Sequence, residues 1–185
     1  MRIAVSGAHG SFSEEAGKEY CRVHGIENPE LLYLVTAENV LAAVEAGAVE
    51  RGIMPIENST GGVVIEAVYA LARHIVHIEK MFEIVVKQNL LVYPGTKREA
   101  ITAITSHDQA IKQCRMYLKR TFPTADITEY PDTAQAAKDL GEGVLSKNTA
   151  IIAPKACAAL YGLEVLEENI NDLKFNVTNF LVVVK

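Results

Sequence analysis

The sequence predicts an α/β protein built from two lobes. Short apolar runs alternate along the 185 residues with segments that open on small polar side chains, a pattern typical of strands and crossover helices. A helix that ends near glycine and is followed by an apolar strand occurs twice, at Gly47 before residues 53–56 and at Gly141 before residues 151–154. A long β-rich stretch, residues 77–93, separates these two halves. Together these observations favour two lobes of similar design.

We expect residues 1–80 to supply three strands and three helices to the first lobe. The strands are expected at residues 2–6, 31–35 and 51–56, and the helices at residues 11–24, 40–45 and 63–74. Ser11 or Ser13 opens the first helix, with acidic residues in its first turn, and Thr36 precedes the second. Ser59 and Thr60 stand in the turn that leads to the third helix.

The second lobe repeats the alternation after the turn at Pro94. Its strands are expected at residues 101–105, 126–130 and 149–153, and its helices at residues 106–121, 133–140 and 154–161. Ser106 and Asp132 are the expected caps of the first two helices, and Pro154 opens the third.

The last apolar run, residues 180–184, is expected to return to the first lobe after a second crossing. The first lobe then comprises residues 1–80 and 175–185, and the second comprises residues 81–174. Two crossings with a cleft between the lobes are typical of periplasmic-binding-protein-like folds. We therefore expect a two-lobed α/β fold of this kind, with the active site in the cleft.

The composition excludes several function classes. With 18 Lys and Arg against 23 Asp and Glu, the net charge is −5, and no basic stripe predicts a nucleic-acid partner. No apolar run reaches the ~20 residues that span a membrane. Because a strand is expected from residue 2, we expect no signal peptide. Cys21, Cys114 and Cys157 form no CxxC pair, which indicates reduced thiols in the cytoplasm and no zinc site.

Several of the expected helix starts carry small polar side chains directly after strands. Unpaired N–H groups and the helix dipole make such starts suited to anions, so carboxylates can be held here without many arginines. For any one of these residues, capping alone is the simpler interpretation. Their convergence on one side of two sheets favours a polar site. They are Ser11 or Ser13, Ser59 with Thr60, Ser106, and Asp132 with Thr133.

Other chemistries have weaker support. Neither GxGxxG nor a Walker A run is present, which disfavours nucleotide binding. His107 follows an expected helix cap and is either a base or a partly exposed structural residue. Glu57 is either a general acid, if burial raises its pKa, or an acceptor for loop amides. Cys114 lies on the apolar face of its expected helix, which favours a core position over a nucleophile.

Six short runs, in order along the whole chain, resemble the prephenate dehydratase family. They are Gly10-Ser11-Phe12-Ser13-Glu14-Glu15-Ala16; Pro55-Ile56-Glu57-Asn58-Ser59 with Gly62; Ser106-His107-Asp108-Gln109-Ala110 through Gln113-Cys114; Thr133-Ala134 with Ala136-Ala137; Ala158-Ala159 with Tyr161-Gly162-Leu163; and Asn176-Val177-Thr178-Asn179-Phe180. Each run alone is weakly specific for the family. Six runs in the family's order are strongly specific.

The resemblance implies a concrete reaction. Prephenate loses its ring carboxylate as CO2 and its ring hydroxyl as water, giving phenylpyruvate on the route to phenylalanine. The resemblance does not decide between prephenate and arogenate as the substrate. Neither a metal nor an organic cofactor is implied. Thr178 falls on the family's threonine, whose hydroxyl would hydrogen-bond the departing oxygen. The residues expected to bind the dicarboxylate substrate are Ser11, Asn58, Ser59, Ser106, Gln109, Gln113, Asn176 and Asn179. By family likeness we expect a homodimer or larger assembly.

The chain departs from the family pattern in three places. Asn179 stands where the family has an arginine, so a neutral amide replaces a bidentate fork for a carboxylate. Gln88 and Asn89 stand where a histidine is common. The sequence also ends at Lys185, where family members continue into a phenylalanine-sensing ACT domain, so we expect a catalytic domain alone or a fragment.

Two alternatives to a dehydratase remain open. A dehydratase-like prephenate decarboxylase releases CO2 but keeps the hydroxyl, and relatives of that kind tend to alter the position of Thr178. A non-catalytic module would bind a small anion or amino acid in the same cleft. An assay for phenylpyruvate, for loss of prephenate and for thermal stabilisation by ligands separates the three.

Overall fold

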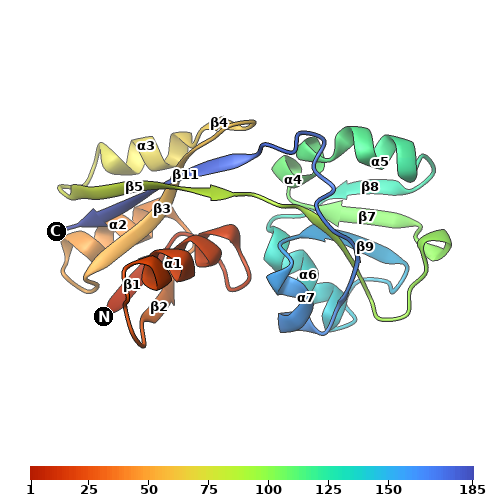
Figure 1. The fold of residues 1–185 in the computed structure, drawn as a ribbon, viewed down its shortest axis with the longest axis horizontal. Helices are drawn as coiled ribbons and strands as arrows, with labels where there is room; N and C mark the ends of the chain where they lie inside the picture. Colours follow the sequence, from red (N-terminus) through yellow and green to blue (C-terminus); the bar gives the residue numbers. More distant parts are fainter. The chain divides into compact units, whose positions relative to one another are not determined.

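The computed structural model describes residues 1–185 and consists of two compact units (Figure 1). Unit 1 comprises Met1–Val85 and Val177–Lys185, and unit 2 comprises Val86–Asn176. The boundaries expected from the sequence, at residues 80 and 175, lie within a few residues of these. The chain therefore passes between the units twice.

Unit 1 is a six-stranded mixed sheet with helices on both faces. Its strands are β1 (Arg2–Val5), β2 (Glu30–Tyr33), β3 (Arg51–Asn58), β4 (Gly62–Val63), β5 (His77–Val85) and β11 (Val177–Val184). Its helices are α1 (Phe12–Val23), α2 (Ala37–Glu45) and α3 (Ile65–Leu71). The strand order is β2-β1-β3-β11-β5, with β4 paired to β3.

Strand β11 lies between β3 and β5 and is antiparallel to both. Strands β1, β2 and β3, which are joined by crossover helices, pair in parallel, whereas β11 does not. Strands joined by a crossover helix run parallel. No crossover helix leads into β11, so this strand can run antiparallel to its neighbours.

Strand β11 contributes to the core on both faces of this sheet. Phe180 and Val182 pack with side chains of α1, and we call this side the α1 face. Leu181 and Val183 pack with side chains of α2 and α3 on the opposite side, the α2/α3 face. On the latter face α2 approaches β3 closely, because a Cβ on Gly52 would come within 2.6 Å of the Val40 side chain.

Unit 2 is a five-stranded mixed sheet with its own core. Its strands are β6 (Asn89–Val92), β7 (Ala103–Ser106), β8 (Asp126–Glu129), β9 (Thr149–Ala153) and β10 (Glu164–Glu167), in the order β10-β6-β9-β7-β8. Its helices are η1 (Arg98–Ala100), α4 (Asp108–Gln113), α5 (Arg115–Thr121), α6 (Thr133–Gly141) and α7 (Ala156–Tyr161). Helix α7 ends at Gly162, whose φ of 64° suits glycine. Strand β10 was not expected from the sequence.

Three local expectations were wrong. Ser59 and Thr60 do not open a helix, because β3 continues through Asn58 and turns into the hairpin strand β4. Ser106 does not cap a helix, because it is the last residue of β7, and His107 takes the cap position instead. The helix expected over residues 106–121 also breaks in two at Cys114.

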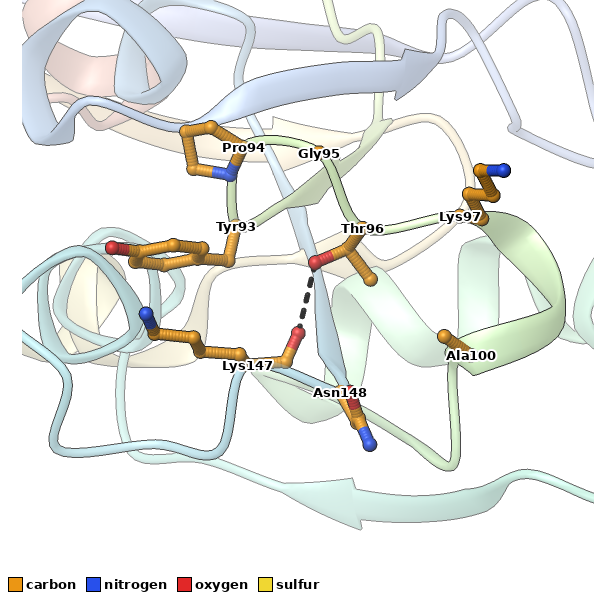
Figure 2. Close-up of a pocket in the computed structure, with 8 residues that line it drawn as sticks. All are labelled: Tyr93, Pro94, Gly95, Thr96, Lys97, Ala100, Lys147 and Asn148. Atoms are coloured by element: carbon orange, nitrogen blue, oxygen red, sulfur yellow. Dashed lines mark hydrogen bonds between the residues drawn. The ribbon is translucent and has the colours of Figure 1, made fainter.

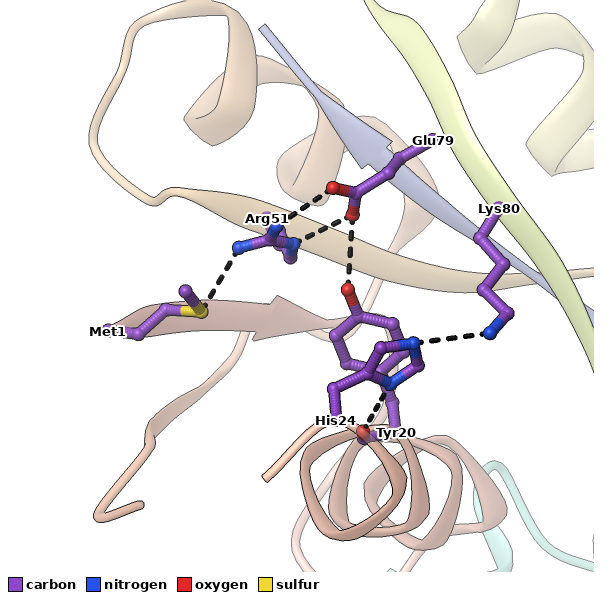
Figure 3. Close-up of polar contacts among 6 residues, drawn as sticks. All are labelled: Met1, Tyr20, His24, Arg51, Glu79 and Lys80. Atoms are coloured by element: carbon purple, nitrogen blue, oxygen red, sulfur yellow. Dashed lines mark hydrogen bonds and ion pairs between the residues drawn. The ribbon is translucent and has the colours of Figure 1, made fainter. Parts of the chain in front are cut away.

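A polar network ties α1, β3 and β5 together in unit 1 (Figure 3). The Arg51 guanidinium binds both oxygens of Glu79, with N···O distances of 2.7 and 2.8 Å. The Tyr20 hydroxyl donates to the same carboxylate at 3.1 Å. Bidentate geometry of this kind fixes the relative positions of the three elements.

None of the helices is long and apolar enough to cross a membrane. All three cysteines are buried, and none forms a disulfide.

Candidate functional site

The hydroxyl of Thr178 is held by the amide of Asn58 on the neighbouring strand. The two residues are paired in register between β11 and β3. Asn58 Nδ2 donates to Thr178 Oγ1 at 2.9 Å and to the Val177 carbonyl at 3.2 Å. Thr178 is only 8% exposed. Because its oxygen accepts from Asn58, the Thr178 hydroxyl proton points away from Asn58 and can be donated elsewhere.

The β3–β4 hairpin fixes the orientation of the Asn58 amide. Asn58 Oδ1 accepts from the backbone N–H groups of Thr60 and Gly61, at 3.0 and 2.8 Å. The Thr60 hydroxyl donates to the same oxygen at 2.7 Å. The oxygen of the Asn58 amide therefore faces the turn and its nitrogen faces Thr178, so this direction follows from the hydrogen-bond network. Gly61 was not predicted as a site residue, and Thr60 was named only among the polar helix starts.

Ser59 and Asn176 lie next to this pair and hold the backbone. Ser59 Oγ accepts from the Val177 N–H at 3.0 Å, while the Ser59 N–H donates to the Val177 carbonyl at 2.8 Å. Asn176 is 1% exposed, and its carbonyl accepts from the Val86 N–H at 2.7 Å. Both residues therefore fix the start of β11, the strand that carries Thr178.

Asn179 lies on the opposite face of the sheet from Thr178. Side chains alternate along a strand, so Thr178 shares the α1 face with Phe180, and Asn179 points to the α2/α3 face. Asn179 is paired in register with Glu57 on β3 and with Glu83 on β5. The structure therefore places it in a row of exposed carboxylates and does not bring it together with the Thr178 hydroxyl.

Ser11 caps α1, with Oγ accepting from the Glu14 N–H at 3.3 Å. The Glu14 carboxylate is nearly fully buried and binds Lys18 Nζ at 2.7 Å and the Gly10 N–H at 2.6 Å. Burial by itself raises the pKa of Glu14, but the hydrogen bonds from Lys18 and Gly10 outweigh it and hold the pKa below its ordinary value. This carboxylate therefore fixes the loop before α1, and Ser11 stands at the edge of that loop.

In unit 2, Ser106 is completely buried. Its hydroxyl donates to the Ile152 carbonyl at 2.6 Å, and its oxygen lies 3.3 Å from Thr133 Oγ1. Thr133, at the start of α6, is only partly buried and is the more accessible of the two hydroxyls. A substrate group would reach Thr133 before Ser106.

Gln113 is half-buried at the end of α4, and its Oε1 accepts from Gln88 Nε2 at 3.0 Å. Gln109, one turn earlier, is exposed. His107 is also exposed, and its ring accepts from the Gln109 N–H at 3.3 Å. Gln88 was noted only as a departure from the family, since its contact with Gln113 spans 25 residues and has no local signal.

Two alternative assignments can be decided from burial. Cys114 is completely buried, and burial raises the pKa of its thiol to about 12, as expected for a core cysteine and not for a nucleophile. Glu57 is exposed on β3, which favours an acceptor for loop amides over a buried general acid. The structure contains no group of three or more His, Cys, Asp or Glu residues placed to hold a metal ion.

A hollow of about 420 Å³ in unit 2 contains none of the predicted site residues (Figure 2). It is lined by Tyr93, Pro94, Gly95, Thr96, Lys97, Ala100, Lys147 and Asn148. Lys147 Nζ lies 4.1 Å from the centre of the Tyr93 ring, and its carbonyl accepts from Thr96 Oγ1 at 3.1 Å. Most of the lining residues are exposed, so we do not assign the catalytic site to this hollow.

The fold defines a two-unit α/β protein of the periplasmic-binding-protein-like class. The chain is similar in fold to a periplasmic substrate-binding protein of an ABC transporter from Coxiella burnetii, with a TM-score of 0.52 and 13% identity over 100% of this chain and 84% of that one. At that identity the likeness concerns the fold alone.

The prephenate dehydratase family profile matches residues 3–185, and the chain belongs to this family. It is 36% identical over 186 residues to arogenate dehydratase 5 of Arabidopsis thaliana, covering 100% of this chain and 42% of that protein. It is 34% identical over 183 residues to the bifunctional chorismate mutase/prephenate dehydratase of Stutzerimonas stutzeri, covering 99% and 48%.

Among solved structures, the chain resembles a prephenate dehydratase from Arthrobacter aurescens in complex with L-Phe. The TM-score is 0.88 and the identity 28%, over 100% of this chain and 60% of that one. The family resemblance read from the six short runs is thus confirmed. The chain spans about half the length, or less, of these curated relatives.

Proposed function

We propose that this chain catalyses the decarboxylating dehydration of prephenate to phenylpyruvate, or of arogenate to phenylalanine, and is therefore a carbon–oxygen lyase. Family membership supports the reaction class. The observation that carries the proposal is the hydrogen bond from Asn58 Nδ2 to Thr178 Oγ1 at 2.9 Å.

The reaction needs a donor for one leaving group. The bond between the ring and its carboxylate breaks and CO2 departs, while the electron pair moves into the ring. The ring C–O bond breaks in turn, and hydroxide leaves and takes up a proton to become water. Aromatisation supplies the driving force, so the protein's task is to orient the substrate and to stabilise the charge that grows on the departing oxygen.

Thr178 suits that task because Asn58 has already taken the accepting role of its hydroxyl. The Thr178 proton is then offered to the departing oxygen, and its hydrogen bond strengthens as negative charge develops there. A preorganised donor in a water-poor site is worth about 3–4 kcal/mol in other enzymes. The small exposed fraction of Thr178 supports such a site.

The remaining predicted residues receive different proposed roles. Gln113, Gln109 and Thr133 are proposed to contact substrate, because their side chains are at least partly exposed. Ser59 and Asn176 are proposed to hold β11 in place. Ser11 is proposed as a contact from the loop before α1, and Ser106 as support for Thr133.

The assay incubates the purified chain with prephenate and follows the absorbance of phenylpyruvate enolate in base; a parallel reaction with arogenate is analysed for phenylalanine by chromatography. Thr178→Ala is expected to lower kcat about tenfold or more, with a nearly unchanged melting temperature. Thr178→Ser, which keeps the hydroxyl, is the matched control and is expected to retain most of the activity. A large loss of stability in Thr178→Ala would instead assign Thr178 a structural role.

The same assay separates the alternatives. Consumption of prephenate without phenylpyruvate would favour a decarboxylase. No consumption, together with a higher melting temperature in the presence of prephenate, would favour a binding module.

We also propose a homodimer or larger assembly in the cytoplasm. Exposed apolar side chains on and around α3 and β5 support the assembly, among them Tyr69, Ile75 and Met81. Three cysteines that form no disulfide support a reducing compartment. Light scattering coupled to gel filtration measures the assembly directly.

A further inference from the structure

Gln88, in the segment between β5 and β6, is attached to two other parts of unit 2. Its backbone N–H donates to Asn171 Oδ1 at 2.7 Å, and its carbonyl accepts from the Ile170 N–H at 2.8 Å. Its side chain reaches the end of α4, where Nε2 donates to Gln113 Oε1 at 3.0 Å. Gln88 is only 4% exposed, so this arrangement is buried.

The segment that holds the Gln88 backbone also holds Gln113. The Asp172 N–H donates to the Gln113 carbonyl at 2.9 Å. The Asp172 carboxylate accepts from the N–H groups of Met116 and Tyr117, at 2.7 and 2.8 Å, and so stabilises the start of α5 after the helix break. The backbones of Gln88 and Gln113 are thus fixed relative to each other, and the bond between their side chains turns the oxygen of the Gln113 amide toward Gln88.

This cluster keeps two buried polar atoms without a hydrogen-bond partner, Gln88 Oε1 and Asn171 Nδ2. An unsatisfied buried polar atom costs free energy, and an apolar side chain at position 88 would avoid the cost at that position. Packing alone therefore does not account for a glutamine here. The bond to Gln113 is the feature that an apolar residue cannot supply.

We infer that Gln88 is a positioning residue for substrate binding, acting through Gln113. By donating to Gln113 Oε1, it keeps the oxygen of that amide turned inward and directs the amide nitrogen, with its N–H donors, to the side away from Gln88. A substrate carboxylate or hydroxyl oxygen then meets a donor at Gln113 and not a carbonyl. The inference rests on the proposed function, because it assumes that Gln113 contacts an oxyanionic substrate.

The test measures KM, kcat and melting temperature with whichever substrate the wild-type chain turns over. Gln88→Met keeps the volume and removes the donor, so the oxygen of the Gln113 amide loses the bond that turns it toward Gln88. KM is expected to rise roughly tenfold, with a smaller change in kcat. Because Gln88→Met also removes an unpaired buried oxygen, the melting temperature is expected to stay the same or rise.

Gln88→Glu provides a second, opposite perturbation. Its carboxylate only accepts, so Gln113 would turn its amino group toward position 88 and present its carbonyl to the substrate. We expect a larger rise in KM than for Gln88→Met. Thr105→Val is the matched control, because Thr105 is equally buried in unit 2 and its hydroxyl donates to the Thr128 carbonyl at 2.8 Å. It should lower the melting temperature and leave KM unchanged.

A double-mutant cycle decides whether Gln88 acts through Gln113. Gln113→Leu is expected to raise KM, and adding Gln88→Met to it is expected to change KM by less than about twofold. An unchanged KM in Gln88→Met, or effects of the two substitutions that multiply, would overturn the inference. If Gln113→Leu leaves KM unchanged while Thr178→Ala still abolishes turnover, the inference fails and the proposed function stands. Absence of turnover in the wild-type chain would overturn both.

Discussion

At the scale of single residues, the direction of one hydrogen bond determines what Thr178 can do. Three donors in the β3–β4 hairpin hold the oxygen of the Asn58 amide, so its nitrogen faces Thr178. A hydroxyl that accepts a hydrogen bond from one side can still donate on the other. The chemistry therefore depends on Asn58 as much as on Thr178.

Asn58→Asp tests this direction with little change in shape. The aspartate still accepts the hairpin N–H groups, but it accepts where the amide donated, so the Thr178 hydroxyl turns and donates to it. We expect kcat to fall about tenfold or more, with a melting temperature near that of the wild type. Glu57→Gln, at the neighbouring exposed position, serves as control and should leave kcat unchanged. Wild-type kcat in Asn58→Asp would mean that the proton of Thr178 is not used.

Asn179→Arg tests a position that the family resemblance assigned to the substrate. An arginine there would lie between Glu57 and Glu83, its partners in register on the two flanking strands. Cross-strand pairs of opposite charge contribute roughly 0.2–1 kcal/mol each. We expect the free energy of unfolding in urea to rise by an amount in this range, with KM unchanged. A lower KM without added stability would return position 179 to the substrate site.

At the residue scale, the family motifs singled out both Asn58 and Thr178, whereas the face that Asn179 occupies depends on where its strand begins. The runs around Asn58 and Thr178 were identified together, although 120 positions separate the two residues. Asn179 was assigned to the substrate because it stands where the family has an arginine after its threonine. Since β11 begins at Val177, the alternation of side chains places Asn179 on the other face.

At the scale of elements, a histidine links two helices of the α2/α3 face. His74 follows α3, and its ring nitrogens lie 2.7 Å from Glu45 and 3.1 Å from Glu38, both on α2. The hydrogen bond to Glu45, followed by that to Glu38, raises the pKa of His74 above its ordinary value of 6.5. The charged ring therefore connects α3 to α2.

The pH dependence of stability follows from this shift. A raised folded-state pKa means that the stabilisation is fully present below about pH 6.5 and is lost as pH rises through the folded-state value. Both glutamates are partly exposed, so we expect a contribution on the order of 0.5 kcal/mol. Urea unfolding between pH 6 and pH 9 should show this decline in the wild type and not in His74→Gln. Parallel curves for the two proteins would contradict the assignment.

The sequence predicted helix starts correctly where the capping residue did not also lie at the end of a paired strand. Ser11, Thr36 and Asp132 each accept an N–H in the first turn of the following helix, as predicted. Ser106 and Ser59 carry the same chemistry but were misassigned. In both places a strand continues further than its apolar run, and strand pairing with residues distant in sequence decides where it ends.

At the scale of the whole molecule, the two units differ in how the chain builds them. Unit 2 takes its core from one continuous stretch, residues 86–176. Both cores of unit 1 need side chains from β11. The sequence predicted that the chain returns to the first unit at its last strand. The insertion of β11 between β3 and β5 was not predicted, because this long-range pairing has no local signal.

This difference predicts the behaviour of fragments. Residues 86–176 expressed alone are expected to fold, with a cooperative thermal transition and dispersed amide resonances. Residues 1–85 alone are expected to remain unfolded or to aggregate, because β3 and β5 lose the strand between them. Adding a peptide of residues 177–185 should restore structure to that fragment, as measured by circular dichroism. A stable fold of residues 1–85 alone would contradict this account.

The placement of β11 also affects the order in which the two units can fold during synthesis. Chains leave the ribosome from the N-terminus, so β3 and β5 emerge long before the strand that joins them. Unit 2 can fold during this interval, while the edges of β3 and β5 that will pair with β11 keep their backbone N–H and C=O groups unpaired. The strand that ends this wait also carries Thr178, so the nascent chain acquires its proposed proton donor at the moment its first unit becomes able to close.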